Sequence, residues 1–209
     1  MAGRLAYSRR TYGAKQVRPV VILGEGAIRG VYVLRIVTNR ALQVSFGRYG
    51  GGAPLLVPAG ELLYVGSAMA CSGSMTLARR LLRHATRAEP HPPQAIRPAL
   101  LAALYAAGLA GEDIRPPANK KLFWNIDFLL NELAVELLQV FAVRSSLPLE
   151  AELASLMAAE TACDPLAPGL GAHDHPGSTH IFIVQEDQRW WQALPDRLAG
   201  LAAAAHSKS

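Results

Sequence analysis

Residues 61–87 read ELLYVGSAMACSGSMTLARRLLRHATR and combine three kinds of local structure. An apolar run, typical of a β-strand, ends at Gly66 and Ser67, and a short loop rich in Gly and Ser follows. The remainder predicts an amphipathic helix, because at 3.6 residues per turn its apolar and basic residues fall on opposite sides. The apolar side holds Leu77, Ala78, Leu81, Leu82 and Ala85, and the polar side Arg79, Arg80, Arg83, His84 and Arg87. This combination is typical of a site for a polyanion.

Length and composition indicate one globular domain with additional segments. The chain has 209 residues, of which 51% are hydrophobic and 18% charged, and this balance excludes general disorder. No apolar run reaches the roughly 18 residues that a membrane span needs, and no apolar segment follows the basic N-terminus as in a secretory signal. Cys71 and Cys163 show neither metal-ligand spacing nor a disulfide framework. We therefore expect a cytoplasmic protein without a membrane partner.

The formal charge of +5 is unevenly distributed along the chain. Residues 1–48 carry nine Lys or Arg and one acidic residue, Glu25, whereas the rest of the chain carries 12 basic and 15 acidic residues. Basic charge pooled in one part of a chain favours a polyanionic partner such as nucleic acid. A basic tail that only aids solubility is the alternative.

Short β-prone runs separated by glycine turns predict a small, mostly antiparallel sheet. The expected strands lie at 20–23, 30–37, 41–46, 55–57, 62–65, 135–143 and 180–184. The expected helices lie at about 75–87, 99–107, 120–130 and 146–161. Helices that flank an antiparallel sheet define an α+β fold class.

Three segments are expected to lie outside this sheet. Residues 1–18 have no apolar periodicity and are interpreted as a basic N-terminal arm. Residues 88–119 are bounded by prolines and are interpreted as a helical insertion, and residues 186–209 as a C-terminal appendage. The domain itself is therefore expected to span residues 19–185.

Short motifs in a fixed order resemble the GIY-YIG nuclease superfamily. They are a strand beginning Gly30-Val31-Tyr32, a strand with Tyr64-Val65-Gly66, the helix motif Leu77-x-x-Arg80 and a later acidic helix with Glu152-Leu153-Ala154. Over roughly residues 29–185 the chain resembles in particular a branch of uncharacterised domains that are sometimes joined to endonuclease III-type repair glycosylases. That branch has a longer connection between its two signature strands, which implies a β-hairpin insertion in this chain.

Other motifs of this branch are present, with two departures from its pattern. The matching ones are Phe46-Gly47-Arg48, Pro58-Ala59-Gly60, Trp124-x-Ile126-Asp127, Gly169-x-Gly171 and His180-x-Phe182. Asn125 stands where relatives usually have a histidine, and His173-Asp174-His175 stands where they usually have Ser-Asp-Cys. His173, Asp174, His175 and His180 suggest a zinc site, because imidazole and carboxylate are zinc ligands, with a solvated loop as the alternative.

The resemblance implies a metal-dependent endonuclease that hydrolyses phosphodiester bonds in nucleic acid, expected to be DNA, in repair or processing. Arg80 would bind the scissile phosphate, because a guanidinium grips phosphate oxygens with paired donors and stays charged. Tyr32 or Tyr64 would help to activate water, although a tyrosinate at neutral pH costs about 4 kcal/mol for a pKa near 10. His84, one turn after Arg80, would act as a general acid or base or bind phosphate, with an exposed helix histidine as the alternative.

The same resemblance places the metal-binding carboxylate, for Mg²⁺ or Mn²⁺, on the helix expected at 146–161. Glu152 is the preferred catalytic ligand. Glu150 is the alternative, because a carboxylate in a first helical turn also has a structural role with the helix dipole. One carboxylate can suffice, since Mg²⁺ completes its shell with water and substrate phosphate.

Further residues are expected to contact the nucleic acid, adding salt-dependent affinity without sequence selectivity. They are Gly66, Ser67, Arg79, Arg83 and Arg87. A DNA-repair protein is a further expected partner. Two other functions stay open: a catalytically inactive nucleic-acid-binding module on the same scaffold, and a protein-interaction domain that docks through Trp190, Trp191 and the inserted helix.

Overall fold

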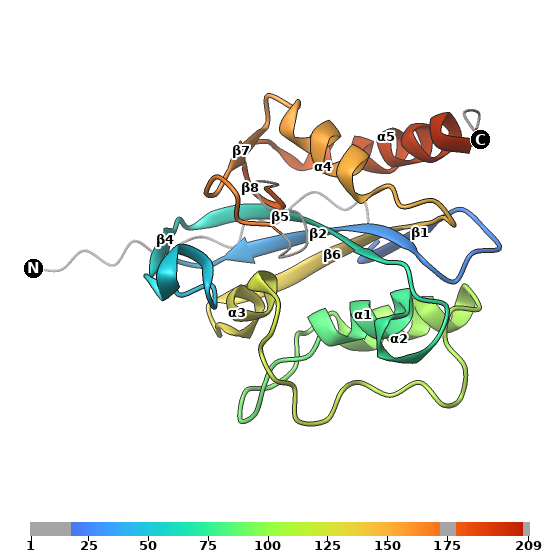
Figure 1. Ribbon diagram of the computed structural model, residues 1–209, viewed down its shortest axis with the longest axis horizontal. Helices are drawn as coiled ribbons and strands as arrows, with labels where there is room; N and C mark the ends of the chain where they lie inside the picture. The colour runs from blue at the N-terminus through green and yellow to red at the C-terminus, as the bar shows by residue number, and fades with distance from the viewer. Residues whose placement is uncertain (1–17, 172–178, 207–209) are drawn as a thin grey trace, which may run out of the picture.

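Three layers make up the protein, whose computed structural model describes residues 18–171 and 179–206. A central sheet lies between α4 (Glu150–Ala158) with α5 (Gln188–His206) on one face and three other helices on the opposite face (Figure 1). These three are α1 (Leu77–His84), α2 (Arg97–Ala106) and α3 (Asn125–Asn131). The α+β fold class predicted from the sequence is thereby confirmed.

The sheet has six strands in the order β1-β6-β2-β5-β8-β7. They are β1 (Val20–Leu23), β2 (Gly30–Thr38), β5 (Gly60–Ala68), β6 (Val135–Arg144), β7 (Cys163–Pro165) and β8 (Ile181–Val184). Every neighbouring pair is antiparallel except β1 with β6, which is parallel. The sheet is therefore mostly antiparallel, as predicted.

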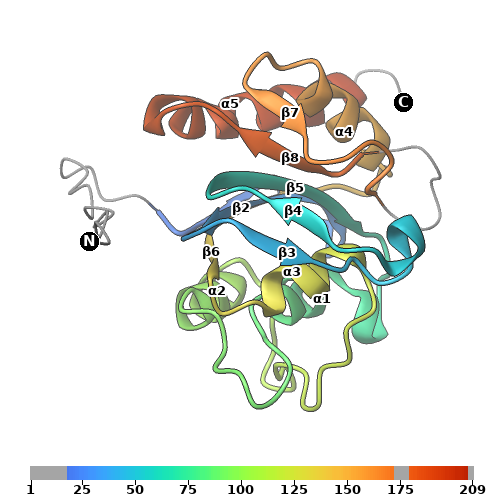
Figure 2. The same cartoon turned by 90° about the vertical axis from the view of Figure 1, so that its left-hand side faces the viewer.

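The connection between β2 and β5 folds as a separate two-stranded hairpin of β3 (Leu42–Val44) and β4 (Leu55–Val57). It lies beside the main sheet in the view of Figure 2. Short 3₁₀ turns at Tyr49–Gly52 and Gly73–Met75 complete the regular structure. The expected β-hairpin insertion is confirmed.

Alternating residues of the central strands supply two separate hydrophobic cores, because successive side chains of a strand point to opposite faces. On β2, Tyr32 and Leu34 join the core beneath α1, α2 and α3, whereas Val31 and Val33 join the core beneath α4 and α5. Residues at one end of β2 and β5 can therefore present groups to either layer.

Two segments that the sequence placed outside the sheet, the insertion and the C-terminal appendage, pack against its two faces. The insertion at 88–119 contains α2, which buries Leu100 and Leu104 in the core shared with α1. The C-terminal segment is not an appendage: α5 buries Trp191 and Leu194, and Trp191 stacks on Phe141 of β6 with ring centroids 6.3 Å apart. Buried tryptophans cannot form a docking surface. The expected basic arm at 1–18 lies almost wholly outside the described residues.

β5 is left open beside the end of β8. β8 pairs with β5 from Glu61 to Tyr64 only, while β2 pairs with β5 through to Ala68. Among the described residues, the last ones of β5 therefore have a neighbouring strand on one side alone, which we call the open edge of β5. No helix of the described chain is long and apolar enough to cross a membrane.

Candidate active site

Tyr32 and Gly66 face each other across the β2–β5 pair. A Cβ atom at Gly66 would lie 2.5 Å from the Tyr32 hydroxyl oxygen and 2.6 Å from the ring carbon that carries it. No other residue fits at this position without displacing the tyrosine. The sequence predicted that Gly66 would contact nucleic acid, but the structure shows that its missing side chain makes room for the Tyr32 ring.

Tyr32, Tyr64 and His84 form one aromatic group, which we call the Tyr–His cluster. The Tyr32 hydroxyl lies 2.7 Å from His84 Nε2. The Tyr64 ring centroid is 6.2 Å from that of Tyr32 and 5.9 Å from that of His84. Strands β2 and β5 and helix α1 thus bring together three of the residues to which the resemblance assigned catalytic roles.

The Tyr–His cluster is buried, which bears on the alternative that His84 is an exposed helix histidine. Tyr32 and His84 are 0% exposed and Tyr64 is 8% exposed. Helical periodicity placed His84 on the polar side of α1, but residues from the α3 region cover this side, and only Arg79 and Arg83 of the helix stay partly exposed. The exposed-histidine alternative is therefore wrong.

Burial sets the protonation of the Tyr–His cluster. It raises the pKa of Tyr32 and Tyr64 well above the usual value near 10, and the positive charge of Arg80 opposes this rise only in part. Burial also lowers the pKa of His84 to about 3, despite the nearby Asp127 carboxylate. At neutral pH all three groups are uncharged, so the Tyr32 hydroxyl can donate its hydrogen bond to an unprotonated Nε2.

Arg80 is held by an aromatic face. Its guanidinium lies 3.6 Å from the ring centroid of Trp124, and one terminal nitrogen is 3.5 Å from Met75 Sδ. In the described ranges no carboxylate pairs with Arg80, and its Nε has no hydrogen-bond partner. A buried arginine without a counter-ion is a ready binding partner for an anion such as phosphate.

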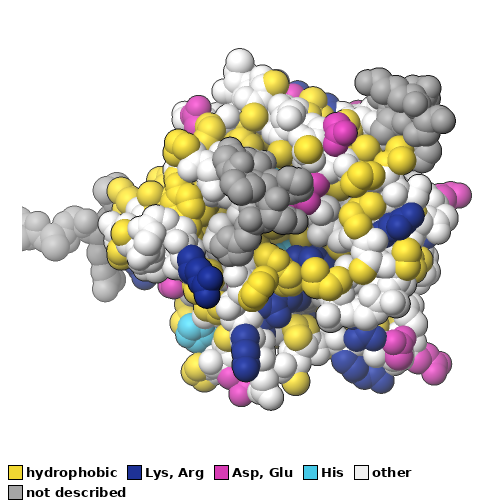
Figure 3. All heavy atoms as spheres, viewed as in Figure 1, with side chains coloured by type: hydrophobic (Ala, Val, Ile, Leu, Met, Phe, Trp, Pro, Cys, Tyr) yellow, Lys and Arg dark blue, Asp and Glu magenta, His cyan; other side chains and the backbone are white. Residues whose placement is uncertain are grey.

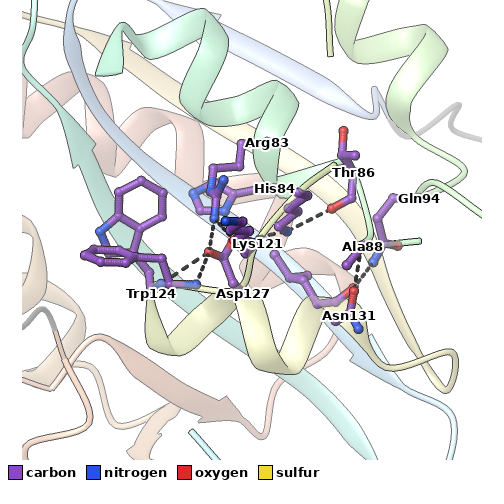
Figure 4. A network of polar contacts seen from close by, with 12 residues as sticks. Arg83, His84, Thr86, Ala88, Gln94, Lys121, Trp124, Asp127 and Asn131 are labelled. Atoms are coloured by element: carbon purple, nitrogen blue, oxygen red, sulfur yellow. Dashed lines mark hydrogen bonds and ion pairs between the residues drawn. The ribbon is translucent and has the colours of Figure 1, made fainter. Parts of the chain in front are cut away.

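Asp127 at the start of α3 is the centre of a buried polar network that the sequence did not assign (Figure 4). Its Oδ2 accepts hydrogen bonds from Arg83 Nη2 at 2.7 Å and from the backbone N–H of Phe123 and Trp124 at 3.1 and 3.2 Å. Its Oδ1 lies 3.1 Å from Lys120 Nζ. Burial alone would raise the pKa of Asp127, but Lys120, His84 and Arg83 outweigh it and lower this pKa. The carboxylate therefore stays charged and fixes the chain that carries Trp124.

The remaining arginines of the predicted nucleic-acid surface differ in their partners. Arg87 is buried and donates to the carbonyl groups of Pro92 at 3.1 Å and Val135 at 2.5 Å, so it has a structural role and is not a phosphate contact. Arg83 is engaged by Asp127 and lies 4.8 Å from the Trp124 ring. Arg79 forms an exposed ion pair with Asp113, which a phosphate can displace at little cost.

Glu150, and not Glu152, is the carboxylate beside the site. Glu150 Oε2 accepts a short hydrogen bond from the Ser67 hydroxyl, and Oε1 lies 3.5 Å from His180 Nδ1. Its negative charge lies near enough to raise the pKa of Tyr32 and Tyr64. Glu152 is exposed, because two residues along a helix turn a side chain by roughly 200°. Ser67, predicted to contact nucleic acid, instead positions Glu150.

The residues at this site could hold a metal ion only as a cation that keeps most of its waters. The described part of the chain contains no group of three or more His, Cys, Asp or Glu that could hold a metal. Glu150 alone is a suitable donor for Mg²⁺ or Mn²⁺, which keep most of their waters. The zinc interpretation involved His173, Asp174 and His175, which lie outside the described residues and leave it a prediction.

A small pocket beside Trp124 borders the Tyr–His cluster at Tyr64. Its lining residues are Tyr64, Trp124, Asn125, Ile126, Leu170, Gly171 and Ile181. The Asn125 amide, at the position where relatives usually have histidine, donates to the carbonyl group of Gly171 at 2.8 Å. Asn125 thus joins α3 to the segment that follows β7.

Comparison with known proteins gives one match. A family model described as a domain of unknown function, DUF123, matches residues 31–202. The matched range continues through most of α5, in agreement with the packing of this helix in the core. No curated protein and no solved structure matches the chain.

Proposed function

The chain belongs to the DUF123 family, a family of domains of unknown function, and on that premise we propose that it is a metal-dependent endonuclease of the GIY-YIG type acting on DNA. One observation carries the proposal. Four elements (β2, β5, α1 and α4) bring the Tyr–His cluster, an arginine without a carboxylate partner and the Glu150 carboxylate to the open edge of β5. The order of motifs along the chain supports the same assignment.

Arg80 would bind the scissile phosphate and stabilise the charge that develops on it. Preorganised donors in a water-poor site are the largest contribution to many reactions of this kind. The Trp124 face holds the guanidinium without neutralising it. Arg80 therefore needs little reorganisation when the phosphate arrives.

Tyr32 would orient the attacking water through its hydroxyl oxygen, and His84 holds that hydroxyl at 2.7 Å. The raised pKa of Tyr32 means that the resting protein carries a neutral phenol and not a tyrosinate. A hydrated Mg²⁺ or Mn²⁺ held by Glu150 would supply positive charge next to the water and the phosphate. Glu150 is itself positioned for this by Ser67.

The proposal is tested with supercoiled plasmid and branched DNA, each with Mg²⁺, Mn²⁺ or a chelator. We expect metal-dependent nicking that Arg80→Ala lowers by about 100-fold or more. Arg189→Ala is the control, since Arg189 is exposed at the start of α5 on the other face of the sheet, and it should stay within a few fold of the wild type. Circular dichroism of both variants shows whether the fold survives. Absence of nicking with either metal would contradict the proposal.

The burial of the Tyr–His cluster favours a second candidate, a nucleic-acid-binding module that has lost catalysis. Two fully buried, uncharged groups, Tyr32 and His84, fit a packing role as well as a chemical one. This candidate predicts binding of DNA or RNA that weakens with salt, without cleavage under any metal condition.

A further inference from the structure

Phe123 is the most exposed large hydrophobic side chain among the described residues, at 65%. It lies two residues before α3 and two residues after Lys121, which is also exposed. By contrast, Ile126, Leu129 and Leu130 of α3 are fully buried in the core. Core packing does not explain an exposed aromatic ring next to a well-packed helix, and such a ring points to a binding role.

The Phe123 ring projects from a rigid frame. Its backbone N–H donates to Asp127 Oδ2 at 3.1 Å, and its ring packs edge-to-face on Trp124 with centroids 5.4 Å apart. Asp127 is in turn fixed by the buried Lys120 at 3.1 Å. The exposed ring is therefore held in a fixed position. We call it the Phe123 platform, because a ring on which a ligand stacks has to be fixed in this way.

Positive charge surrounds this platform. The Trp124 ring that supports Phe123 also contacts Arg80 at 3.6 Å and Arg83 at 4.8 Å. In Figure 3, Lys and Arg side chains lie next to hydrophobic ones around a hollow near the middle of one face. An aromatic ring near Arg80, with which no carboxylate of the described residues pairs, combines the two features that bind single-stranded nucleic acid: stacking for a base and positive charge for the backbone.

We propose that Phe123 stacks on an unpaired base of a nucleic acid whose backbone lies toward Arg80, so that the site selects single-stranded or branched substrates over intact duplex. The inference rests on the proposed function and adds the substrate class to it. Bases within a duplex already stack on their neighbours and offer no free face, whereas an unpaired base does. Every base has such a face, so this contact selects the state of the strand and not its sequence.

The test measures binding in the presence of a chelator, so that it does not depend on cleavage. Fluorescence anisotropy compares a labelled single-stranded oligonucleotide with the duplex of the same sequence at low salt. We expect the wild type to prefer the single strand, and Phe123→Ala to weaken single-strand binding by about 10-fold or more while leaving duplex binding within about twofold. Phe123→Trp should retain the preference.

Leu133→Ala is the matched control, because Leu133 is another exposed hydrophobic residue, at 58%, just after α3. It should bind both forms like the wild type. Equal loss of single-strand and duplex binding in Phe123→Ala, no loss in that variant, or a wild type that binds neither form would each overturn the inference.

The two proposals fail in different ways. A strand preference that depends on Phe123, without nicking in Mg²⁺ or Mn²⁺, would support base stacking and contradict the nuclease. Metal-dependent nicking with the same preference in Phe123→Ala as in the wild type would support the nuclease and overturn base stacking.

Discussion

The contact between Gly66 and Tyr32 shows how a single missing side chain shapes the site. The tyrosine ring occupies the space over the glycine and from there reaches His84. The resemblance to the GIY-YIG superfamily placed both residues in signature motifs, but only the strand register and the space at Gly66 show that the glycine accommodates the Tyr32 ring. Glycine at this position thus determines where the proposed water-orienting hydroxyl lies.

Gly66→Ala is expected to displace the Tyr32 ring and to lower the free energy of unfolding by about 1–3 kcal/mol, since the new methyl group overpacks the core. Urea unfolding followed by circular dichroism measures this change. Gly200→Ala is the control: Gly200 lies in α5 with open space at its Cβ position, and alanine there should be neutral or stabilising by up to about 1 kcal/mol. Equal stability of the two variants would contradict the packing role of Gly66.

The buried His84 makes stability depend on pH. Its folded-state pKa of about 3 lies below the ordinary value near 6.5, so the unfolded chain takes up a proton first as pH falls. This contribution to stability is complete above pH 6.5 and is lost progressively toward pH 3. Between pH 6.5 and 4.5 the wild type should lose about 1 kcal/mol per pH unit through this group.

The control for this prediction is His84→Gln, which keeps a polar partner for Tyr32 but does not titrate. Its free energy of unfolding should change less over the same pH range, so the difference between the two proteins narrows on acidification. Parallel curves for the wild type and His84→Gln would show that the folded-state pKa of His84 is not lowered.

At the scale of elements, residues 120–124 before α3 cover the basic side of α1, so α1 is a largely buried helix and not a surface helix. Trp124 covers Arg80, and Lys120 donates to the carbonyl group of Thr86 just after α1 at 2.8 Å. Asp127 connects these contacts through its ion pairs with Lys120 and Arg83. The geometry of the proposed phosphate site therefore depends on a network outside α1 itself.

Asp127→Asn should be strongly destabilising, by about 3 kcal/mol or more, because it leaves the fully buried Lys120 without a counter-charge. The amide oxygen can still accept the backbone N–H groups of Phe123 and Trp124, so the variant isolates the loss of charge. Combining it with Lys120→Met should recover part of the stability in urea unfolding, since methionine needs no counter-ion. A single variant that costs less than about 1 kcal/mol would contradict this account.

The sequence predicted where the strands lie better than it predicted which side chains pack against each element. Glycine turns and β-branched runs located β1, β2, β6 and β8 closely, because these signals are local. The faces of α1 were predicted less well, since helical periodicity does not reveal that Trp124 covers Arg80 or that Arg87 holds backbone carbonyl groups. Such contacts join residues far apart in the chain.

At the scale of the whole molecule, the candidate site joins the two helical layers. Arg80 and His84 come from α1 on one face of the sheet, whereas Glu150 starts α4 on the other (Figure 1). Glu150 contacts Ser67 near the end of β5 and His180 just before β8, and its charge reaches Tyr32 and Tyr64 of the Tyr–His cluster. Sequence alone could not choose between Glu150 and Glu152, because this choice depends on how α4 is rotated against the sheet edge.

Contacts across the whole molecule also explain why the sequence analysis interpreted residues 186–209 as an appendage. Residues 188–206 have a proline at position 195 and many alanines, so they resemble a loosely attached tail. In the structure Trp191, Leu194 and Leu198 complete the core beneath α4 and α5, and the Arg35 guanidinium lies 4.7 Å from the Trp191 ring. The buried charge of Arg35 is matched by Glu61 at 2.7 Å, a pairing between strands that no local pattern predicts.

The measurement that tests the central claim most directly is a nicking assay with Mg²⁺ and Mn²⁺ on the isosteric pair Glu150→Gln and Glu152→Gln. Both changes remove one negative charge from the first turn of α4, so they affect the helix dipole alike. We predict that Glu150→Gln abolishes metal-dependent cleavage, or lowers it by about 100-fold or more, while Glu152→Gln cleaves like the wild type. Equal activity in the two variants, or loss in Glu152→Gln alone, would contradict the assignment of the site to the open edge of β5.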